Sequence, residues 1–159
     1  MAGIRRLNHA VLYVRDAQRT AQFFREVLGF VTVQEAAGGR AVFLRASGSD
    51  NHHDIGLFSV GPQAPNQRGV GLYHLAWQVD TIDELVAIRE KLVAAGALAG
   101  ESDHGVSKSL YAHDPDGIEF EVMWMVPEHA WGSYATDAVV APLNLGAEQQ
   151  KWSGVSTRV

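Results

Sequence analysis

Two histidines stand in the same short pattern at two places in the chain. The segments LNHAVLYV, which starts at Leu7, and LYHLAWQV, which starts at Leu72, both fit Leu-x-His-x-x-x-x-Val and put His9 and His74 at equivalent positions. A buried imidazole needs hydrogen-bond partners that Leu or Val would not need, so packing gives no reason for the repeat. Neutral imidazole is a common metal ligand in proteins. We therefore predict that His9 and His74 bind one metal ion.

The apolar pattern that follows His9 predicts a β-α-β-β-β unit. Residues 7–14 are rich in β-branched and aromatic side chains, as in a buried strand, and Asp16 is a candidate helix N-cap. Apolar residues then recur at helical spacing up to Leu28, and Gly29 stands where a left-handed residue commonly ends a helix. Three further strands are predicted, at residues 30–35, 40–46 and 54–60.

The second half of the chain repeats this order. We predict a strand at 72–79, a helix capped by Asp80 or Thr81 that stops at an AAG sequence, and later strands at 107–113 and 117–125. A half of about 60 residues buries too little surface to be stable alone, so we expect two modules packed side by side in a single domain. The predicted boundaries are module one 4–61, a Pro- and Gly-rich linker 62–70, module two 71–126 and a C-terminal tail 127–159 within the domain 1–159.

Composition limits the classes of function. The chain has 159 residues, 47% of them hydrophobic, a net charge of −5 and no cysteine. The acidic balance and the lack of a Lys/Arg cluster argue against nucleic acid as a partner. The lack of cysteine excludes disulfides and thiolate ligands and is typical of a cytoplasmic protein, and no apolar stretch is long enough to predict a membrane span or a signal peptide. Any metal must be held by His, Asp or Glu.

A carboxylate from the last predicted strand is the candidate third ligand. The sequence DPDG at 114–117 predicts a β-turn that leads directly into this strand. Glu119 and Glu121 share one face of the strand because side chains alternate with a period of two. A carboxylate on a half-buried strand face is costly without a partner, and strand periodicity alone does not separate the two candidates.

Residues 4–126 resemble the vicinal oxygen chelate superfamily, which includes glyoxalase I, fosfomycin- and bleomycin-resistance proteins, methylmalonyl-CoA epimerase and type I extradiol dioxygenases. The resemblance implies an α+β fold in which two paired β-α-β-β-β modules form a U-shaped mixed sheet around a divalent metal. It also implies that His9, His74 and Glu121 are the metal ligands. Glu121 is preferred to Glu119 because the family glutamate stands four residues after the turn glycine.

A longer motif is similar to that of the extradiol dioxygenases, which cleave catechol rings with O2. It runs from His104 through GVSKS, Leu110, Tyr111, AH, DPDG and IEF to Glu121, with one departure at Ser102. By this resemblance His104 and Tyr111 donate hydrogen bonds to substrate oxygens. The HHDIGLF segment also resembles those enzymes and makes His53 the acid–base residue, whereas His52 is interpreted as a surface histidine.

The resemblance therefore predicts an extradiol ring-cleaving dioxygenase that acts on a small aromatic substrate of the catechol type and forms a homodimer. Fe(II) is the expected cofactor, with Mn(II), Zn(II) or Ni(II) as alternatives. Two other functions stay open: a glyoxalase-like lyase or epimerase, and a module that binds a flat ligand without chemistry. Glyoxalase I takes a fourth ligand, a Glu, at about the position of Gly56, where this chain has no carboxylate, and Asp54 lies too near the strand start to replace it obviously. The tail is expected to cover either the cup of the sheet or a partner subunit.

Overall fold

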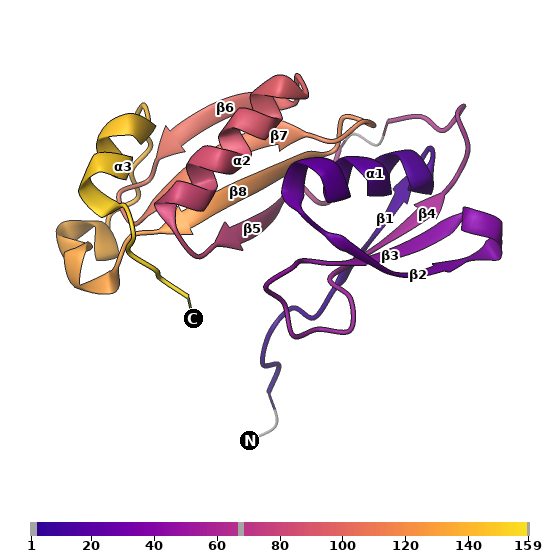
Figure 1. Cartoon of the computed structure of the whole chain (residues 1–159), viewed down its shortest axis with the longest axis horizontal. Coiled ribbons are helices and arrows are strands. Elements are labelled where there is room, and N and C mark those ends of the chain that lie inside the picture. The colour runs from indigo at the N-terminus through magenta and orange to yellow at the C-terminus, as the bar shows by residue number, and fades with distance from the viewer. Residues whose placement is uncertain (1–2, 67–68, 159) are drawn as a thin grey trace. The chain divides into compact units, whose positions relative to one another are not determined.

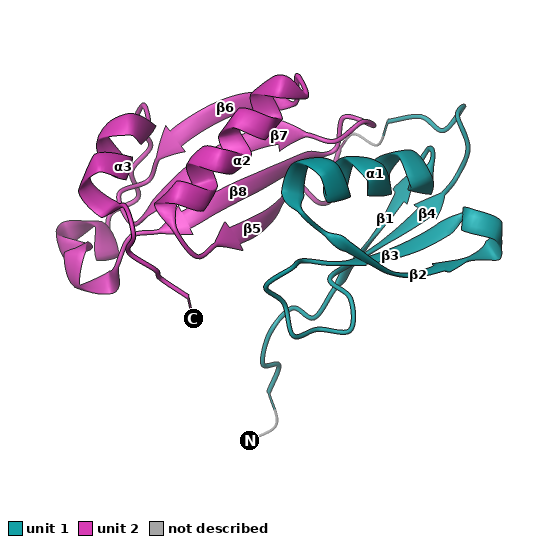
Figure 2. Cartoon of the chain, viewed as in Figure 1, with its two compact units in different colours: residues 1–68 teal, residues 69–159 magenta. Residues whose placement is uncertain are grey.

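The chain divides into two compact units, residues 1–68 and 69–159 (Figure 2). The computed structural model describes residues 3–66 and 69–158. The boundary falls within the linker predicted at 62–70. Each unit contains one four-stranded mixed sheet, and helix α1 belongs to the first unit while α2 and α3 belong to the second (Figure 1).

Unit 1 is a β-α-β-β-β module. Its elements are β1 (Ala10–Val14), α1 (Ala17–Leu28), β2 (Val31–Ala36), the single turn η1 (Ala37–Gly39), β3 (Ala41–Arg45) and β4 (Ile55–Ser59). The strand order is β1-β4-β3-β2, in which β1 and β4 are parallel and the other pairs are antiparallel. The helix and the three later strands therefore lie within a residue or two of their predicted ranges.

Unit 2 repeats this topology. Its elements are β5 (Leu75–Val79), α2 (Ile82–Ala94), β6 (Leu98–Asp103), β7 (Ser107–His113) and β8 (Glu119–Met125), followed by η2 (Glu128–Ala130), η3 (Gly132–Ala135) and α3 (Leu145–Trp152). The order β5-β8-β7-β6 again pairs the first and last strands in parallel. The pairing of the second and third strands carries an irregularity in both units, between Thr32 and Gln34 and between Leu98 and Gly100. The predicted α+β class and the internal repeat are confirmed, although the residues of β6 were not predicted.

Helix α1 forms where its caps and its apolar spacing agree. The Asp16 carboxylate accepts hydrogen bonds from the backbone N–H groups of Gln18 and Arg19 at 2.9 and 3.2 Å. Gly29 ends the helix in the left-handed region with φ 73°, a conformation that glycine adopts at no steric cost. The residues that α1 buries are Ala17, Thr20, Ala21, Phe24 and Val27, a stripe at helical spacing.

Helix α2 covers one face of the unit 2 sheet. Thr81 and Glu84 form a reciprocal capping box, which confirms Thr81 rather than Asp80 as the cap. Ile82, Leu85 and Leu92 are fully buried beneath the helix, as are Leu110, Val122 and Trp124 on the strands. Since strand side chains alternate, the residues between these apolar ones, including Glu119 and Glu121, lie on the opposite face of the sheet. The apolar core and the candidate site therefore occupy opposite faces.

Both candidate histidines stand one residue before the first strand of their units, and not inside a strand as predicted. The regular pairing of β1 begins at Ala10, where its N–H donates to the carbonyl of Asp54. The carbonyl of Asn8 instead accepts a hydrogen bond from the Asn51 side chain at 2.9 Å. A side chain, and not strand pairing, therefore holds the segment that contains His9. In unit 2 the pairing of β5 begins at Leu75 opposite Phe120, because β8 starts only after the turn at 114–117.

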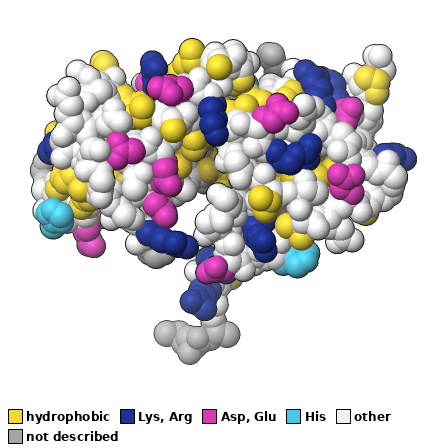
Figure 3. All heavy atoms as spheres, viewed as in Figure 1, with side chains coloured by type: hydrophobic (Ala, Val, Ile, Leu, Met, Phe, Trp, Pro, Cys, Tyr) yellow, Lys and Arg dark blue, Asp and Glu magenta, His cyan; other side chains and the backbone are white. Residues whose placement is uncertain are grey.

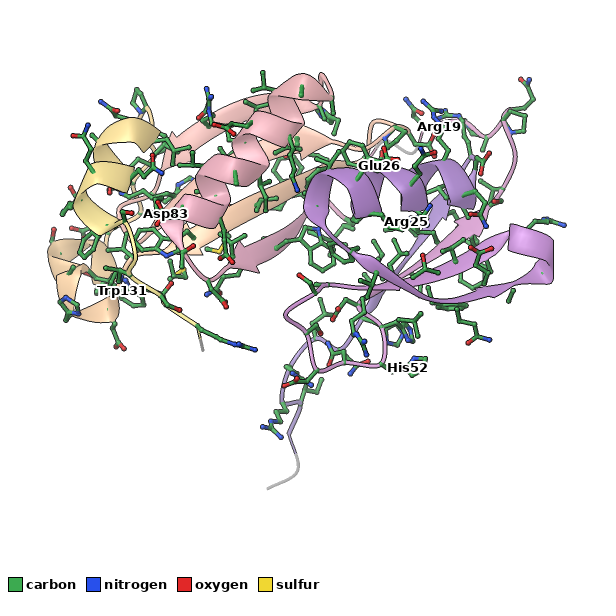
Figure 4. The ribbon with its side chains drawn as sticks, viewed as in Figure 1. Arg19, Arg25, Glu26, His52, Asp83 and Trp131 are labelled. Atoms are coloured by element: carbon green, nitrogen blue, oxygen red, sulfur yellow. The ribbon has the colours of Figure 1, made fainter. Side chains whose placement is uncertain are left out.

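The C-terminal tail packs within its own unit. Helix α3 lies against α2 (Figure 1), and the Trp124 and Trp152 rings are 6.0 Å apart. Asp83, in the first turn of α2 (Figure 4), accepts hydrogen bonds from the Gln149 side chain and the Gly154 backbone, both at 2.9 Å. Helix α3 therefore extends the α2 side of unit 2, whereas Val139, earlier in the tail, contacts His104.

The described surface mixes charges of both signs. On the face shown in Figure 3, Lys and Arg side chains are interspersed with Asp and Glu. In residues 3–66 and 69–158, no helix has the length and the apolar content that crossing a bilayer requires.

Removal of the Asp83 carboxylate should loosen the tail. Hydrogen bonds, first from Gln149, hold the pKa of Asp83 below its ordinary value, so this contact is present at neutral pH and is lost only as the pH falls through that lowered pKa. In Asp83→Ala we expect the α3 amides to exchange with deuterium several-fold faster at pH 7, while the β7 and β8 amides keep their protection. Glu90→Ala, an exposed change on the same helix, is the control. Unchanged α3 exchange in Asp83→Ala would show that this carboxylate does not hold the tail.

Candidate metal site

His74 and Glu121 meet on the open face of the unit 2 sheet. The parallel register of β5 and β8 pairs Leu75 with Phe120 and Ala76 with Glu121, which brings the preceding His74 close to the same carboxylate. The distance from His74 Nε2 to Glu121 Oε2 is 3.1 Å. The Glu121 side chain is only 12% exposed and that of His74 is 23% exposed, so both donor atoms are partly withdrawn from water.

This pair fits one coordination sphere. Two donor atoms that are each about 2.1 Å from one metal ion, at right angles to each other, lie about 3.0 Å apart. The observed separation of 3.1 Å agrees with that value. An imidazole nitrogen and a carboxylate oxygen are also the donor types that Fe(II), Mn(II) and Zn(II) accept. The residues of unit 2 are therefore suited to supply two ligands to a divalent metal.

Glu119 occupies the other side of the His74 ring. Its Oε1 is 3.4 Å from His74 Nδ1, and both atoms are buried without a hydrogen-bond partner among the described residues. Its charge also raises the pKa of Tyr73, and its Oε2 is 3.8 Å from His113 Nε2. A ligating histidine usually donates its second ring N–H to a carboxylate or a carbonyl, which orients the ring. The two glutamates on this face are thus distinguished by the imidazole nitrogen that each approaches.

His104 and Tyr111 form a hydrogen-bonded pair on the same face. His104 Nε2 is 2.8 Å from the Tyr111 hydroxyl, and the Tyr111 ring centroid is 5.8 Å from that of His74. Burial, followed by the negative charge of Glu121, raises the pKa of Tyr111, so its hydroxyl stays protonated at neutral pH. The structure therefore assembles four of the predicted residues, His74, His104, Tyr111 and Glu121, within unit 2.

Unit 1 holds His9 through a chain of amide side chains. Asn51 donates to the Asp54 carboxylate at 2.7 Å, and the Asn8 amide donates to Asn51 Oδ1 at 3.4 Å. Asn8 Oδ1 in turn lies 2.9 Å from His9 Nδ1. An amide oxygen can only accept, so Nδ1 carries the proton and Nε2 of the neutral ring has the lone pair that a metal would bind. Asn8 and Asn51 were not predicted as site residues, because their only signal in the sequence is that they flank the histidines.

His53 lies beside His9 in the same unit. Their ring centroids are 4.5 Å apart, and His53 also contacts the Phe43 ring at 5.2 Å. Partial burial, followed by the positive charges that His9 and His52 can carry, lowers the pKa of His53. The neutral form of His53 therefore predominates at neutral pH and can accept a proton. His52 is exposed in the loop before β4 (Figure 4), which agrees with its interpretation as a surface residue.

The first module offers no carboxylate at the position of Gly56. A Cβ atom there would lie 3.3 Å from the Phe43 ring, so the site has little room for a side chain. Asp54 is buried, with a residue exposure of 8%. Its carboxylate accepts hydrogen bonds from the Ala46 N–H and the Ser49 hydroxyl, both at 2.8 Å, and from the Asn51 side chain. Asp54 thus organises the loop before β4.

The predicted residues fall into two groups that belong to different units. His9 and His53 are together in unit 1, and the other four are together in unit 2. In the described part of the chain, no three His, Asp or Glu side chains within either unit are arranged to hold a metal. The convergence of His9 with His74 and Glu121 stays a prediction.

Two named dioxygenases are similar to this chain in sequence. The chain is 30% identical over 128 residues to a catechol-2,3-dioxygenase from Bacillus subtilis (strain 168), and 26% identical over 129 residues to a manganese-dependent 2,3-dihydroxybiphenyl 1,2-dioxygenase from Geobacillus genomosp. 3. Each match covers 79% of this chain but only 43% and 38% of those proteins. The chain therefore spans about two fifths of the length of these relatives.

Solved structures share the fold at lower identity. A glyoxylase/bleomycin resistance protein/dioxygenase domain from Frankia sp. EAN1pec has a TM-score of 0.66 at 21% identity and covers 82% of this chain and 99% of its own. A fosfomycin resistance protein from Listeria monocytogenes, solved with Mn(II), has a TM-score of 0.64 at 22% identity and covers 83% and 99%. The family model named Glyoxalase/Bleomycin resistance protein/Dioxygenase superfamily matches residues 6–122, and with its repeated β-α-β-β-β modules this chain belongs to that superfamily.

Proposed function

We propose that this protein is a metal-dependent extradiol dioxygenase that cleaves a catechol-type ring with O2 and uses Fe(II). The observation that carries the proposal is the group on the open face of unit 2, where His74 and Glu121 lie 3.1 Å apart beside the hydrogen-bonded pair of His104 and Tyr111. The names of the two relatives above support the same reaction class, and one of them names manganese as its metal.

In this proposal His9, His74 and Glu121 hold the metal. Two neutral imidazoles and one carboxylate around a divalent cation leave a net charge of about +1, which favours a deprotonated substrate. When bound, Fe(II) supplies open positions for two catecholate oxygens and O2 and lowers the pKa of the substrate hydroxyl. The protein contributes the partly buried sheet face that orients the ring and limits access of water.

His53 is proposed as the acid–base residue. Its lowered pKa keeps the imidazole neutral at neutral pH, so it can take the second phenolic proton and return it later in the reaction. Such a role is worth about 10²–10⁴ in rate. The Phe43 ring packs edge-on against His53 and restrains its orientation. His53 therefore combines a neutral ring that can accept a proton with a defined position in unit 1.

The structure gives no specific support to a glyoxalase-like site in this chain. A fourth carboxylate from the first module would need space at Gly56, which the Phe43 ring limits, or a free Asp54, whose oxygens already accept hydrogen bonds from Ala46, Ser49 and Asn51. The three proposed ligands His9, His74 and Glu121 would leave positions on the metal for substrate and O2, as an oxygen-activating centre requires.

Oxygen consumption tests the proposal. The protein is loaded anaerobically with Fe(II), or with Mn(II) in parallel, and mixed with catechol, methylcatechols or 2,3-dihydroxybiphenyl. We expect O2 uptake together with the visible absorbance of a ring-opened semialdehyde. His53→Ala should lower kcat by about 10²–10⁴ and leave metal content unchanged. His129→Ala, a change in an exposed histidine of η2, should keep nearly full activity.

Three outcomes would contradict the proposal. Uptake by the wild type that does not exceed that of His53→Ala, with either metal and every catechol, would remove the dioxygenase function. Stoichiometric metal binding without uptake would instead favour another enzyme of the superfamily, and ligand binding without metal would favour a sequestering module.

Metal affinity distinguishes the two glutamates. Glu121→Ala removes a proposed ligand and should abolish measurable Mn(II) binding in anaerobic titration calorimetry. Glu119→Ala removes the carboxylate whose Oε1 lies 3.4 Å from His74 Nδ1 and should weaken binding by about 10- to 100-fold, while Glu119→Gln, which keeps an oxygen in the side chain, should weaken it less. Glu90→Gln, which removes the same charge from the exposed side of α2, is the control. Equal affinities of Glu119→Ala and wild type would exclude an orienting role for Glu119.

A further inference from the structure

The backbone of the C-terminal tail contacts His104 directly. His104 Nδ1 is 2.8 Å from the carbonyl oxygen of Val139, which belongs to the segment between η3 and α3. A carbonyl oxygen can only accept a hydrogen bond, so the proton of this contact must sit on Nδ1. The tail therefore fixes which nitrogen of His104 is protonated.

This assignment sets the direction of the next hydrogen bond. In a neutral imidazole with the proton on Nδ1, Nε2 has a lone pair and no proton. The Tyr111 hydroxyl, 2.8 Å from Nε2, must then be the donor. Its only proton is committed to His104, so the Tyr111 oxygen offers lone pairs to any further partner. This direction is opposite to the one implied by the family resemblance, in which both residues donate to substrate.

Several contacts hold Val139 in place. The backbones of Asp103, just before His104, and Ala141, just after Val139, exchange two hydrogen bonds of 2.8 and 2.9 Å. The Tyr134 ring covers Gly105, where an added Cβ would lie 2.5 Å from Tyr134 Cγ. Gly105 has φ 76°, so a residue with a side chain is disfavoured there for two reasons. The tail is thus anchored immediately before and after His104.

The Asp103 side chain ties this anchor to the sheet. Its carboxylate accepts from the Gly105 N–H at 2.8 Å and from Lys108 Nζ. Lys108 is 5% exposed and also lies 3.8 Å from Glu148 of α3. A buried ammonium needs such partners, and movement of the tail would take away one of the two carboxylates next to Lys108. Lys108 therefore links the Asp103–Ala141 contact to helix α3.

We propose that tail residues 131–141 form a positioning element that holds His104 in the Nδ1–H tautomer and makes Tyr111 a hydrogen-bond acceptor toward the substrate. The tautomer follows from the contacts of unit 2 alone, whereas the role toward substrate rests on the proposed function. A substrate hydroxyl would donate to Tyr111, whose proton already points to His104. The segment lies beyond the residues 6–122 that the family model matches.

Nitrogen NMR of the full-length protein tests the tautomer without any assay of activity. Protein labelled with ¹⁵N in histidine is studied at pH 8 by long-range proton–nitrogen correlation, and His104→Gln assigns the signal. We expect Nδ1 of His104 to show the shift of a protonated nitrogen and Nε2 that of an unprotonated one, with an excess of about tenfold over the other tautomer. An Nε2–H tautomer or an even mixture would overturn the inference.

Two variants test whether the tail causes this state. Ala141→Pro deletes the N–H that donates to Asp103, and Tyr134→Ala removes the ring over Gly105 without a proline constraint. Circular dichroism identifies the variants that keep the wild-type fold. In these variants the excess of the Nδ1–H tautomer of His104 should fall several-fold. Val140→Ala, an exposed change in the same segment, is the control and should leave the excess unchanged. A folded variant with an unchanged tautomer would refute the role of the tail. If the wild type has the Nδ1–H tautomer of His104 but shows no oxygen uptake, the proposed function is contradicted and the positioning role is not.

Discussion

Parallel pairing of the first and last strands of unit 2 is the constraint on which the candidate site depends. The register that sets Leu75 opposite Phe120 also sets His74 beside two glutamates, one facing each ring nitrogen. A shift of one residue would turn both glutamates into the apolar layer beneath α2, where an unpaired carboxylate costs several kcal/mol. Buried residues such as Val122 and Trp124 therefore select the register that the chemistry needs.

The sequence predicted the elements whose signals are local. Asp16, Gly29 and Thr81 cap helices through their own side chains or their own conformational freedom, so the helix limits could be derived from them. Strand β6, with the sequence LAGESD, has few β-forming residues. It exists because β7 pairs with it and because Arg89 of α2 holds Glu101 with two hydrogen bonds, of 2.9 and 2.8 Å. Contacts with elements distant in the sequence leave no pattern in the residues of the strand itself.

Candidate ligands were also easier to predict than the groups that orient them. His9 and His74 are marked by a repeat and Glu121 by the family resemblance, whereas the groups that contact these residues are not marked in any such way. Asn51 reaches Asn8 across a loop, and Val139 acts through its main chain, which any residue could supply. Main-chain contacts made by a distant segment cannot be derived from side-chain spacing.

Two of the predicted site imidazoles are nevertheless held in the same proton state by unrelated means. An amide oxygen fixes the proton of His9 on Nδ1, and a backbone carbonyl does the same for His104. In both rings Nε2 then has a free lone pair, suited in His9 to a metal and in His104 to the Tyr111 hydroxyl. A shared tautomer would be of little use if these residues only filled space, because either tautomer packs equally well. Hydrogen bonds that choose between tautomers, at the cost of ordering an asparagine pair and a long tail, favour a chemical role for the histidines over a structural one.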